Sequence, residues 1–197
     1  MRTYRINEIF YSIQGEGEHT GKAAIFVRFS GCNLKCPFCD TDFKAFVEAT
    51  AEQIVTHVKE LGGDCRFVVL TGGEPSLQAD IALIDAFHRA GYYVAIETNG
   101  TMPMLIPVDW VTVSPKQSFV GSVGTPRIRK ANEVKVVFDI NNPPSTFGIE
   151  AEHYYLQPCD KGNERENSAI VKACVDYILE HSKWKLSLQT QKIINVR

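Results

Sequence analysis

The sequence predicts an α/β protein with a largely parallel sheet, because strand-like and helix-like segments alternate along most of its 197 residues. A chain of this length can bury a hydrophobic core, and we expect a single domain over residues 1–197. Polar or glycine-rich motifs follow five of the expected strands. Because ligands of parallel sheets gather at the carboxyl ends of the strands, these motifs predict one active-site opening.

The first half of the chain contains three expected strands and two expected helices. Segments rich in β-branched and aromatic residues predict strands at 24–29, 67–70 and 92–96. Thr50 and Gln53 form a capping box that begins a helix, and Gly62 and Gly63 end it. The apolar stripe of this helix consists of Ile54, Val55, Val58 and Leu61. A second helix has Ile81, Ile84 and Phe87 on one face, and its expected C-cap is Gly91.

The second half of the chain continues this alternation. Strands are expected at 110–113, 133–138, 154–156 and 185–188. A long helix is expected at 168–180, because pairs of apolar residues recur one turn apart from Ile170 to Leu179. Residues 118–132 are rich in glycine and basic residues and lack periodicity, which predicts a loop.

The composition argues against several classes of protein. A formal net charge of -2 gives no reason to expect a nucleic-acid partner. The N-terminal residues are too polar for an export signal, and no long apolar run predicts a membrane segment. Three of the six cysteines are clustered and three are scattered, which is not the pattern of a disulfide scaffold. We therefore expect a cytoplasmic protein in a reducing compartment.

The clustered cysteines, Cys32, Cys36 and Cys39, have the spacing C-x3-C-x2-C. Iron–sulfur clusters are usually held by four cysteine thiolates. Three thiolates therefore leave one iron of a four-iron cluster open to a substrate or cofactor. The alternative is a structural zinc site, which requires a fourth ligand such as Cys65 or His57.

The cysteine segment is the first of the five motifs that follow strands. The other four are TGGEP at 71–75, ETNG at 97–100, SPK at 114–116 and QP at 157–158. The cysteine triplet followed by GGEP resembles the radical S-adenosylmethionine (SAM) superfamily. More narrowly, the chain resembles the 7-carboxy-7-deazaguanine synthase family from about Ile6 onward. The further motifs that carry this resemblance are QGEG at 14–17, Arg28, CDT at 39–41, VSPK at 113–116 and LQT at 188–190.

The resemblance implies a fold, a reaction and a set of cofactors. The fold is a reduced, incomplete version of the (β/α)6 partial barrel of radical SAM enzymes. The reaction is a ring contraction of 6-carboxy-5,6,7,8-tetrahydropterin to 7-carboxy-7-deazaguanine with release of ammonia, a carbon–nitrogen lyase step in the queuosine precursor pathway. The cofactors are a [4Fe-4S] cluster, SAM and Mg²⁺. The family is typically homodimeric, and an electron-donor protein such as flavodoxin or ferredoxin is expected.

Each matching position carries a role in the family. The cluster ligands are Cys32, Cys36 and Cys39, and the magnesium ligand is Thr41. The residues that bind SAM are Phe38, Gly72, Gly73, Glu74, Glu97, Asn99, Ser114, Lys116 and Gln157. The residues that bind substrate are Gln14, Glu16, Arg28, Thr71 and Gln189.

The chemistry of the substrate agrees with two of these roles. The carboxylate of Glu16 suits the N–H donors of an aminopyrimidinone, and the guanidinium of Arg28 suits a carboxylate. The structural alternatives are an exposed turn for Glu16, a surface charge on an edge strand for Arg28, and a cap of the cysteine loop for Asp40. Phe38 packs either near the adenine or against the cluster, and Cys159 and His19 are further candidates for contact with the site.

One position departs from the family pattern. Gln191 stands where a histidine is expected near the substrate carboxylate. An amide donates a hydrogen bond but carries no charge, so any role of an imidazolium is in doubt. A rival enzyme class, the activases of glycyl-radical enzymes, shares the cysteine triplet. The QGEG segment and the lack of an extra cysteine-rich insert argue against it.

Overall fold

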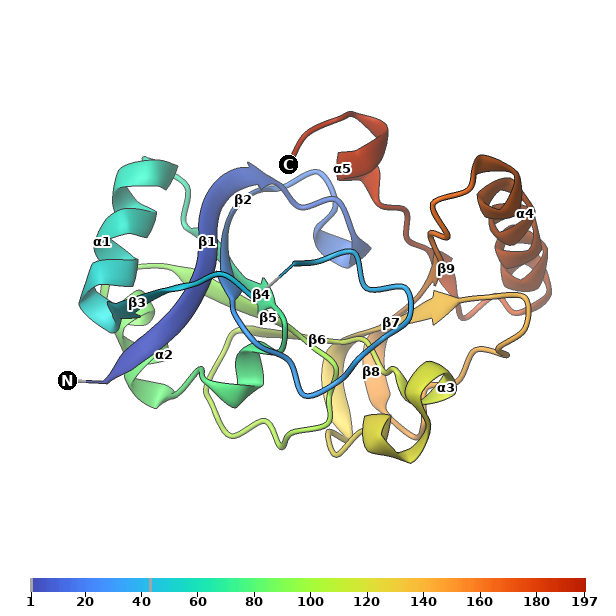
Figure 1. Cartoon of the computed structure of the whole chain (residues 1–197), viewed down its shortest axis with the longest axis horizontal. Coiled ribbons are helices and arrows are strands. Elements are labelled where there is room, and N and C mark those ends of the chain that lie inside the picture. Colours follow the sequence, from blue (N-terminus) through green and yellow to red (C-terminus); the bar gives the residue numbers. More distant parts are fainter. Residues whose placement is uncertain (1, 43) are drawn as a thin grey trace.

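The strands of the protein form one nine-stranded sheet, seen in a computed structural model that describes residues 2–42 and 44–197 (Figure 1). The strand order is β3-β1-β2-β4-β5-β6-β7-β8-β9. The strands are β1 (Thr3–Ile13), β2 (Ala23–Phe29), β3 (Val47–Thr50), β4 (Phe67–Gly72), β5 (Tyr93–Thr98), β6 (Trp110–Val113), β7 (Lys130–Phe138), β8 (Glu150–Pro158) and β9 (Lys185–Leu186). All neighbouring pairs from β2 to β9 are parallel, whereas β1 runs antiparallel to β2 and β3. The expected α/β fold with a largely parallel sheet is confirmed.

The helices of residues 2–42 and 44–197 are fewer than a complete (β/α) barrel requires, as expected. They are α1 (Ala51–Gly62), α2 (Ile81–Arg89), α3 (Gln117–Val120), α4 (Glu164–Glu180) and α5 (Thr190–Ile193), with 3-10 turns η1 (Gly17–His19), η2 (Pro75–Leu77) and η3 (Gly121–Gly124). In the part of the chain that the structure describes, the longer helices α1, α2 and α4 precede β4, β5 and β9, and the other parallel strands are joined by loops or short turns. Figure 1 shows α1 and α2 at one end of the sheet and α4 at the other. Within the described residues, no helix is long and apolar enough to cross a membrane.

β1 and β3 are not among the expected strands. Tyr4 and Ile6 of β1 are buried, as an alternating pattern requires. The pairing with β2 then shifts register between Ile6 and Glu8, and this irregularity interrupts the alternation. β3 has only four residues, all of them exposed or half-buried, so it gives little signal in the sequence.

Several boundaries also differ from expectation. α4 begins at Glu164 rather than at 168, because Asn163 caps a polar first turn that carries no apolar pattern. β8 is longer and β9 shorter than expected. The region 118–132 is not simply a loop, since it contains most of α3, all of η3 and the start of β7.

The helix ends are mostly as expected. The capping box between Thr50 and Gln53 is present. Gly91 follows the C-cap residue Ala90 and has a φ of 81°, which favours glycine. Leu61 of α1 is 39% exposed and is not part of the buried stripe. Gly62 is buried at this end of the helix instead. It packs so closely on β2 that an added Cβ would lie 2.3 Å from the Cδ1 of Ile25.

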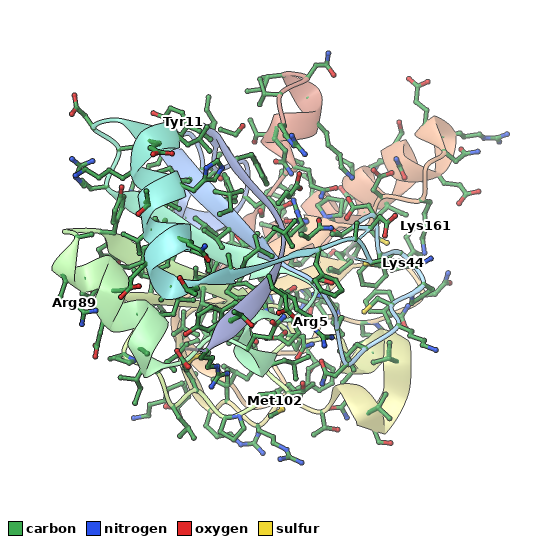
Figure 2. The ribbon with its side chains drawn as sticks, turned by 60° about the vertical axis from the view of Figure 1, so that its left-hand side comes forward. Arg5, Tyr11, Lys44, Arg89, Met102 and Lys161 are labelled. Carbon is green, nitrogen blue, oxygen red and sulfur yellow. The ribbon has the colours of Figure 1, made fainter. Side chains whose placement is uncertain are left out.

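The core lies between the sheet and its helices in two main clusters. α1 and α2 bury residues such as Val58 and Phe87 against β1, β2, β4 and β5. α4 buries Ile170 and Cys174 against β7 and β8. Figure 2 is turned so that α1 and α2 come forward, and Arg89 of α2 lies on their outer side. These core contacts do not occupy the carboxyl ends of the parallel strands, where the site lies.

Candidate active site

A cavity of about 410 Å³ lies at the carboxyl ends of the parallel strands, beneath the segment that follows β2. Except for Glu74, every residue expected in the site lines this cavity. These residues are Gln14, Glu16, Arg28, Cys32, Cys36, Phe38, Cys39, Thr41, Thr71, Gly72, Gly73, Glu97, Asn99, Ser114, Lys116, Gln157 and Gln189. The fold thus brings together segments from the whole length of the chain, as the positions of the motifs after the strands predict.

Glu74 is turned away from the cavity. Its side chain is 1% exposed, and Oε1 accepts a hydrogen bond of 2.6 Å from the hydroxyl of Thr98. Oε2 accepts one of 2.7 Å from the backbone N–H of Asn99. The carboxylate therefore holds the end of β5 in place, and the residues of this motif that line the cavity are Thr71, Gly72 and Gly73.

These two glycines allow the strand ends after β2 and β4 to approach closely. Gly72 has a φ of 126°, and a Cβ at Gly73 would lie 1.9 Å from the carbonyl oxygen of Gly31. The N–H of Gly73 donates to the carbonyl of Phe29 at 3.0 Å. Only glycine fits this backbone contact, which aligns the cysteine loop with the end of β4.

The three clustered cysteines lie on the loop after β2 and all line the cavity. They are free thiols, and burial raises the pKa of Cys32 and Cys36. The backbone N–H of Cys39 donates to the carbonyl of Cys36 at 3.2 Å, which draws the loop into a tight turn. Three thiols on one loop beside one cavity are a suitable donor set for an iron–sulfur cluster with three protein ligands.

The two candidates for the fourth ligand of a zinc site, Cys65 and His57, do not line the cavity. The Sγ of Cys65 lies 3.4 Å from the carbonyl oxygen of Ala23, at the start of β2 and therefore at the opposite end of the sheet from the cysteine loop. His57 is exposed on α1. Within 2–42 and 44–197, no group of three or more His, Cys, Asp or Glu side chains is arranged to hold a single metal ion.

Residues after β5 and β6 form the part of the cavity next to the cysteine loop. The amide nitrogen of Asn99 donates to the side-chain oxygen of Asn33 at 3.0 Å, which links β5 to that loop. Lys116 donates to the carbonyl of Ser114 at 2.8 Å and also bonds its hydroxyl. Burial lowers the pKa of Lys116 to about 8. Phe38 contacts Phe119 of α3 edge to face, with ring centroids 4.6 Å apart.

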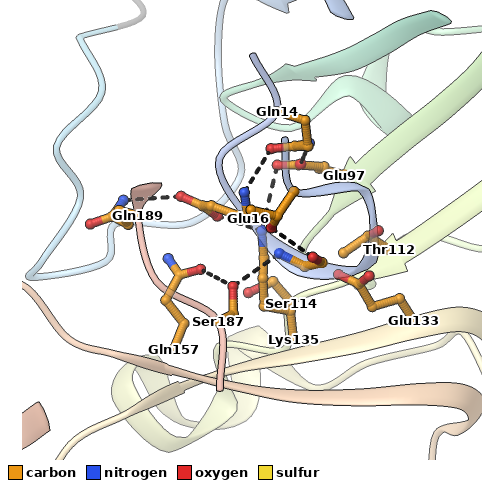
Figure 3. A network of polar contacts seen from close by, with 12 residues as sticks. Gln14, Glu16, Glu97, Thr112, Ser114, Glu133, Lys135, Gln157, Ser187 and Gln189 are labelled. Carbon is orange, nitrogen blue, oxygen red and sulfur yellow. Dashed lines mark hydrogen bonds and ion pairs between the residues drawn. The ribbon is translucent and has the colours of Figure 1, made fainter. Parts of the chain in front are cut away.

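Glu16 is the centre of a network of polar contacts in the cavity (Figure 3). Its Oε2 lies 2.5 Å from the ammonium of Lys135. Its Oε1 accepts hydrogen bonds from the amides of Gln189 and Gln191 at 3.1 and 3.2 Å. Burial alone would raise the pKa of Glu16, but the ammonium and the two amides outweigh it and lower the pKa to about 2. The side chain is 15% exposed, which rules out the alternative of an exposed turn.

Arg28 lines the cavity from β2, between β1 and β4. The alternative of an edge-strand position is therefore wrong. Its Nε lies 2.7 Å from an oxygen of Glu8, and its guanidinium lies over the ring of Phe10 at 5.5 Å. Within the described residues, the hydrogen bond to Glu8 uses the Nε–H of the guanidinium, so its terminal NH groups can serve an acidic ligand in the cavity.

Thr41 and Asp40 lie at the mouth of the cavity, where three segments meet. The ammonium of Lys192 lies 2.8 Å from Asp40 and 2.9 Å from Asp160. The hydrogen bond from Lys192 holds the pKa of Asp160 well below its usual range. Asp40 therefore connects the cysteine loop to the C-terminal segment, in addition to accepting a 3.4 Å contact from the hydroxyl of Thr41.

The comparisons with known proteins agree with this site. The model of the Radical SAM superfamily matches residues 26–116. A 7-carboxy-7-deazaguanine synthase from Bacteroides thetaiotaomicron is 50% identical over 193 residues, which are 98% of each chain. The chain belongs to the 7-carboxy-7-deazaguanine synthase family.

Other members of the family support the assignment. The 7-carboxy-7-deazaguanine synthase from Burkholderia multivorans is 39% identical and covers 98% of this chain and 99% of its own. The crystal structure of QueE from Escherichia coli superposes with a TM-score of 0.75 at 28% identity, over 95% of this chain and 94% of that one. Membership in this radical SAM family implies a [4Fe-4S] cluster and SAM, and the three cavity thiols and the close Gly72–Gly73 backbone suit both groups. The rival assignment to glycyl-radical activases is not favoured.

Several residues that line the cavity are not among the expected ones, and Lys135 and Asp160 are two charged examples. Lys135 lines the cavity from β7, where Glu133, Lys135 and Val137 alternate with residues of the core. Charged residues at alternate positions of an otherwise apolar strand are the signal that predicts such a face. Asp160, after β8, also lines the cavity, but it is ordinary in a loop and gives no such signal.

Of the remaining residues considered in the sequence, some line the cavity and others belong to the core. Cys159 lines the cavity, as one alternative held, whereas Cys174 is a fully buried core residue. His19 is not a cavity residue, since its ring packs against Phe67 and Trp110 at centroid distances of 4.9 and 4.4 Å. Gln191, at the position of the expected histidine, lies against Gly15, where a Cβ would be 1.7 Å from its amide oxygen.

Proposed function

We propose that this protein converts 6-carboxy-5,6,7,8-tetrahydropterin to 7-carboxy-7-deazaguanine and ammonia by radical SAM chemistry, as one domain over residues 1–197. One observation carries the proposal. A buried, ionised carboxylate at Glu16 and a guanidinium at Arg28 face the same cavity as three cysteine thiols. The names of relatives 50% and 39% identical to this chain support the same reaction.

The substrate side of the cavity suits the pterin. The Glu16 carboxylate would accept N–H donors of the aminopyrimidinone in exchange for the amides of Gln189 and Gln191. Arg28 would pair its terminal NH groups with the 6-carboxylate of the substrate. Gln14 donates to Glu97 at 2.8 Å, and we assign it a supporting position beside Thr71 at the edge of the substrate.

The cofactor side of the cavity consists of the cysteine loop and the ends of β4, β5 and β6. Cys32, Cys36 and Cys39 would hold the cluster. When bound, the cluster and SAM supply a carbon radical that removes a hydrogen atom from the substrate. The backbone of Gly72 and Gly73 would receive the methionyl amine of SAM, and the buried side chain of Lys116 suits an anionic group such as its carboxylate. Glu97, Asn99, Ser114 and Gln157 would bind its other polar groups, and Phe38 would pack near its adenine.

Turnover of the reconstituted protein tests the proposal. The anaerobically reconstituted protein is incubated with SAM, a reductant and carboxytetrahydropterin, and the products are separated and identified. We expect 7-carboxy-7-deazaguanine and ammonia in equal amounts, with 5′-deoxyadenosine well below them, because the conversion is redox-neutral and removes no net hydrogen atom from the substrate. If 5′-deoxyadenosine forms while the pterin remains unchanged, the protein performs radical SAM chemistry on another substrate, and the proposed reaction is wrong.

Arg28→Ala is expected to weaken binding of the pterin far more than binding of SAM. A hydrogen bond to a charged group contributes about 1.5–3 kcal/mol, or about one to two decades of affinity. The two dissociation constants are compared by titration. Arg66→Ala is the control, because Arg66 bonds backbone carbonyls before β4, at the opposite end of the sheet. An equal loss of SAM affinity would assign Arg28 to the cofactor or to the fold.

We further propose that Mg²⁺ binds at Thr41 and orders the substrate. Mg²⁺ keeps several ligands from water or substrate, so one hydroxyl from the protein is sufficient. Thr41→Val keeps the shape but removes the hydroxyl, so it should abolish most of the stimulation of turnover by Mg²⁺ and leave iron content unchanged. Product formation is measured with and without Mg²⁺, and Thr56→Val on the exposed side of α1 serves as the control. Equal stimulation of both variants would show that the metal binds elsewhere.

The assembly and the source of electrons are also proposals. We propose a homodimer, as is typical of the family, and light scattering during size-exclusion chromatography tests it by giving the mass of the particle. We propose that a small redox protein such as flavodoxin or ferredoxin supplies the electron. Turnover with a reduced flavodoxin or ferredoxin in place of a chemical reductant tests this, and a lack of product would argue against it.

A further inference from the structure

Lys135 is a buried cation among carboxylates (Figure 3). Its side chain is 5% exposed, and its ammonium lies 2.5 Å from Glu16 and 3.9 Å from Glu97. Burial alone would lower the pKa of Lys135, but Glu16, Glu97 and Glu133 outweigh burial and raise it. Lys135 therefore remains charged, which a buried lysine does only when it is paired.

Glu16 depends on this cation more than on its other neighbours. Among the residues that the structure describes, Lys135 is the only one that forms an ion pair with Glu16. The C-terminal segment contributes two neutral amides to its other oxygen. Lys116 near the end of β6 is a more distant cation, and the carboxylates Glu97 on β5 and Glu133 on β7 act on Lys135 as well.

We propose that Lys135 is a positioning residue that keeps the Glu16 carboxylate ionised and directed into the cavity, and thereby sets the affinity for the N–H donors of the substrate. Lys135 bonds Oε2 of Glu16, so that Oε1 is the oxygen whose amide partners can be exchanged. The identity of the ligand, an aminopyrimidinone, rests on the proposed function. The positioning of Glu16 by Lys135 rests on the structure.

Removal of the ammonium should make substrate binding depend on pH. Without Lys135, burial is the largest influence on the pKa of Glu16 and raises it, while the amides of Gln189 and Gln191 each lower it by less, so Glu16 takes up a proton at a higher pH than in the wild type. A protonated carboxyl group accepts fewer hydrogen bonds than a carboxylate. Its own O–H is a donor and is repelled by the N–H donors of the ligand. In the wild type the Glu16 pKa of about 2 keeps the carboxylate ionised throughout the neutral range.

The test is a pair of titrations of the reconstituted holoenzyme with carboxytetrahydropterin and with SAM. In Lys135→Met, we expect pterin affinity to fall about tenfold or more between about pH 8.5 and about pH 6, relative to the wild type. Protonation of the pterin itself affects the wild type and the variant equally, so it does not change this ratio. SAM affinity should fall less than pterin affinity, because Lys135 lies 3.9 Å from Glu97 but only 2.5 Å from Glu16, and iron content should stay near the wild-type value. Lys135→Gln, which keeps an N–H donor without the charge, provides the same test if the methionine variant does not fold.

Glu16→Gln separates positioning from a general structural effect. In the Glu16→Gln background, Lys135→Met should cause no pH-dependent loss, because no carboxyl group is left to titrate. Lys172→Met on the exposed side of α4 is the matched control for loss of a lysine. A pterin affinity of Lys135→Met with the wild-type pH profile, or an equal loss of SAM affinity, overturns the positioning role. A wild type that binds SAM but not the pterin overturns the proposed function instead.

Discussion

Cys36→Ala is expected to lose the cluster and all reductive cleavage of SAM. Cys32, Cys36 and Cys39 are the three cysteines of the loop after β2, and a cluster with three protein ligands depends on each of them. Burial raises the pKa of the Cys36 thiol, so an anionic Cys36 needs the compensation that a bound metal provides. Iron content and 5′-deoxyadenosine are measured after anaerobic reconstitution.

Cys65→Ala is the matched control for this variant. Cys65 is a half-buried cysteine before β4, at the end of the sheet away from the cavity. We expect it to keep full iron content and SAM cleavage. A Cys36→Ala protein that retains a complete cluster and forms 5′-deoxyadenosine would disprove the assignment of the ligands.

Gly73→Ala is expected to lower SAM affinity by about one to two decades, since overpacking of a filled site costs about 1–3 kcal/mol. The added Cβ would lie 1.9 Å from the carbonyl oxygen of Gly31, which is a backbone atom. This contact cannot be relieved by rotating a side chain, so the segment before Cys32 must move. The displacement separates the end of β4 from the cysteine loop, and the dissociation constant of SAM measures it.

Gly162→Ala is the control for loss of a glycine. Gly162 has a φ of 68° and no atom within 4 Å of an added Cβ, so its substitution strains only the local backbone. We expect a cost of about 1 kcal/mol in the free energy of unfolding and no change in SAM affinity. If Gly73→Ala binds SAM as the wild type does, the Gly72–Gly73 segment is not the part of the cavity that receives SAM.

Much of the site follows from positions along the chain. The motifs after β2, β4, β5, β6 and β8 carry most of the side chains that line the cavity. In a parallel sheet the carboxyl ends of strands share one edge, so residues that follow successive strands must meet there. For this reason the sequence alone predicts that the cysteine loop, Gly72–Gly73, Asn99 and Lys116 lie together.

The partners of these side chains were not predictable in the same way. Glu74 belongs to a strand-end motif, yet its carboxylate turns toward β5 and bonds Thr98 and Asn99. Lys135 ends beside Glu16, although 119 positions separate them along the chain. Such contacts depend on the twist of the sheet and on side-chain directions, which local spacing does not specify.

The same distinction applies to the whole molecule. Alternating strands and helices, the cysteine spacing and the glycine pair are local patterns, and they are sufficient to predict the α/β class, the family and the edge of the sheet that carries the site. The charge state of Glu16 depends on Lys135, Gln189 and Gln191, which reach it only after β7 and the C-terminal segment have packed around the cavity. Ionisation of a buried group depends on the sum of all nearby charges and dipoles, so it is a property of the folded structure.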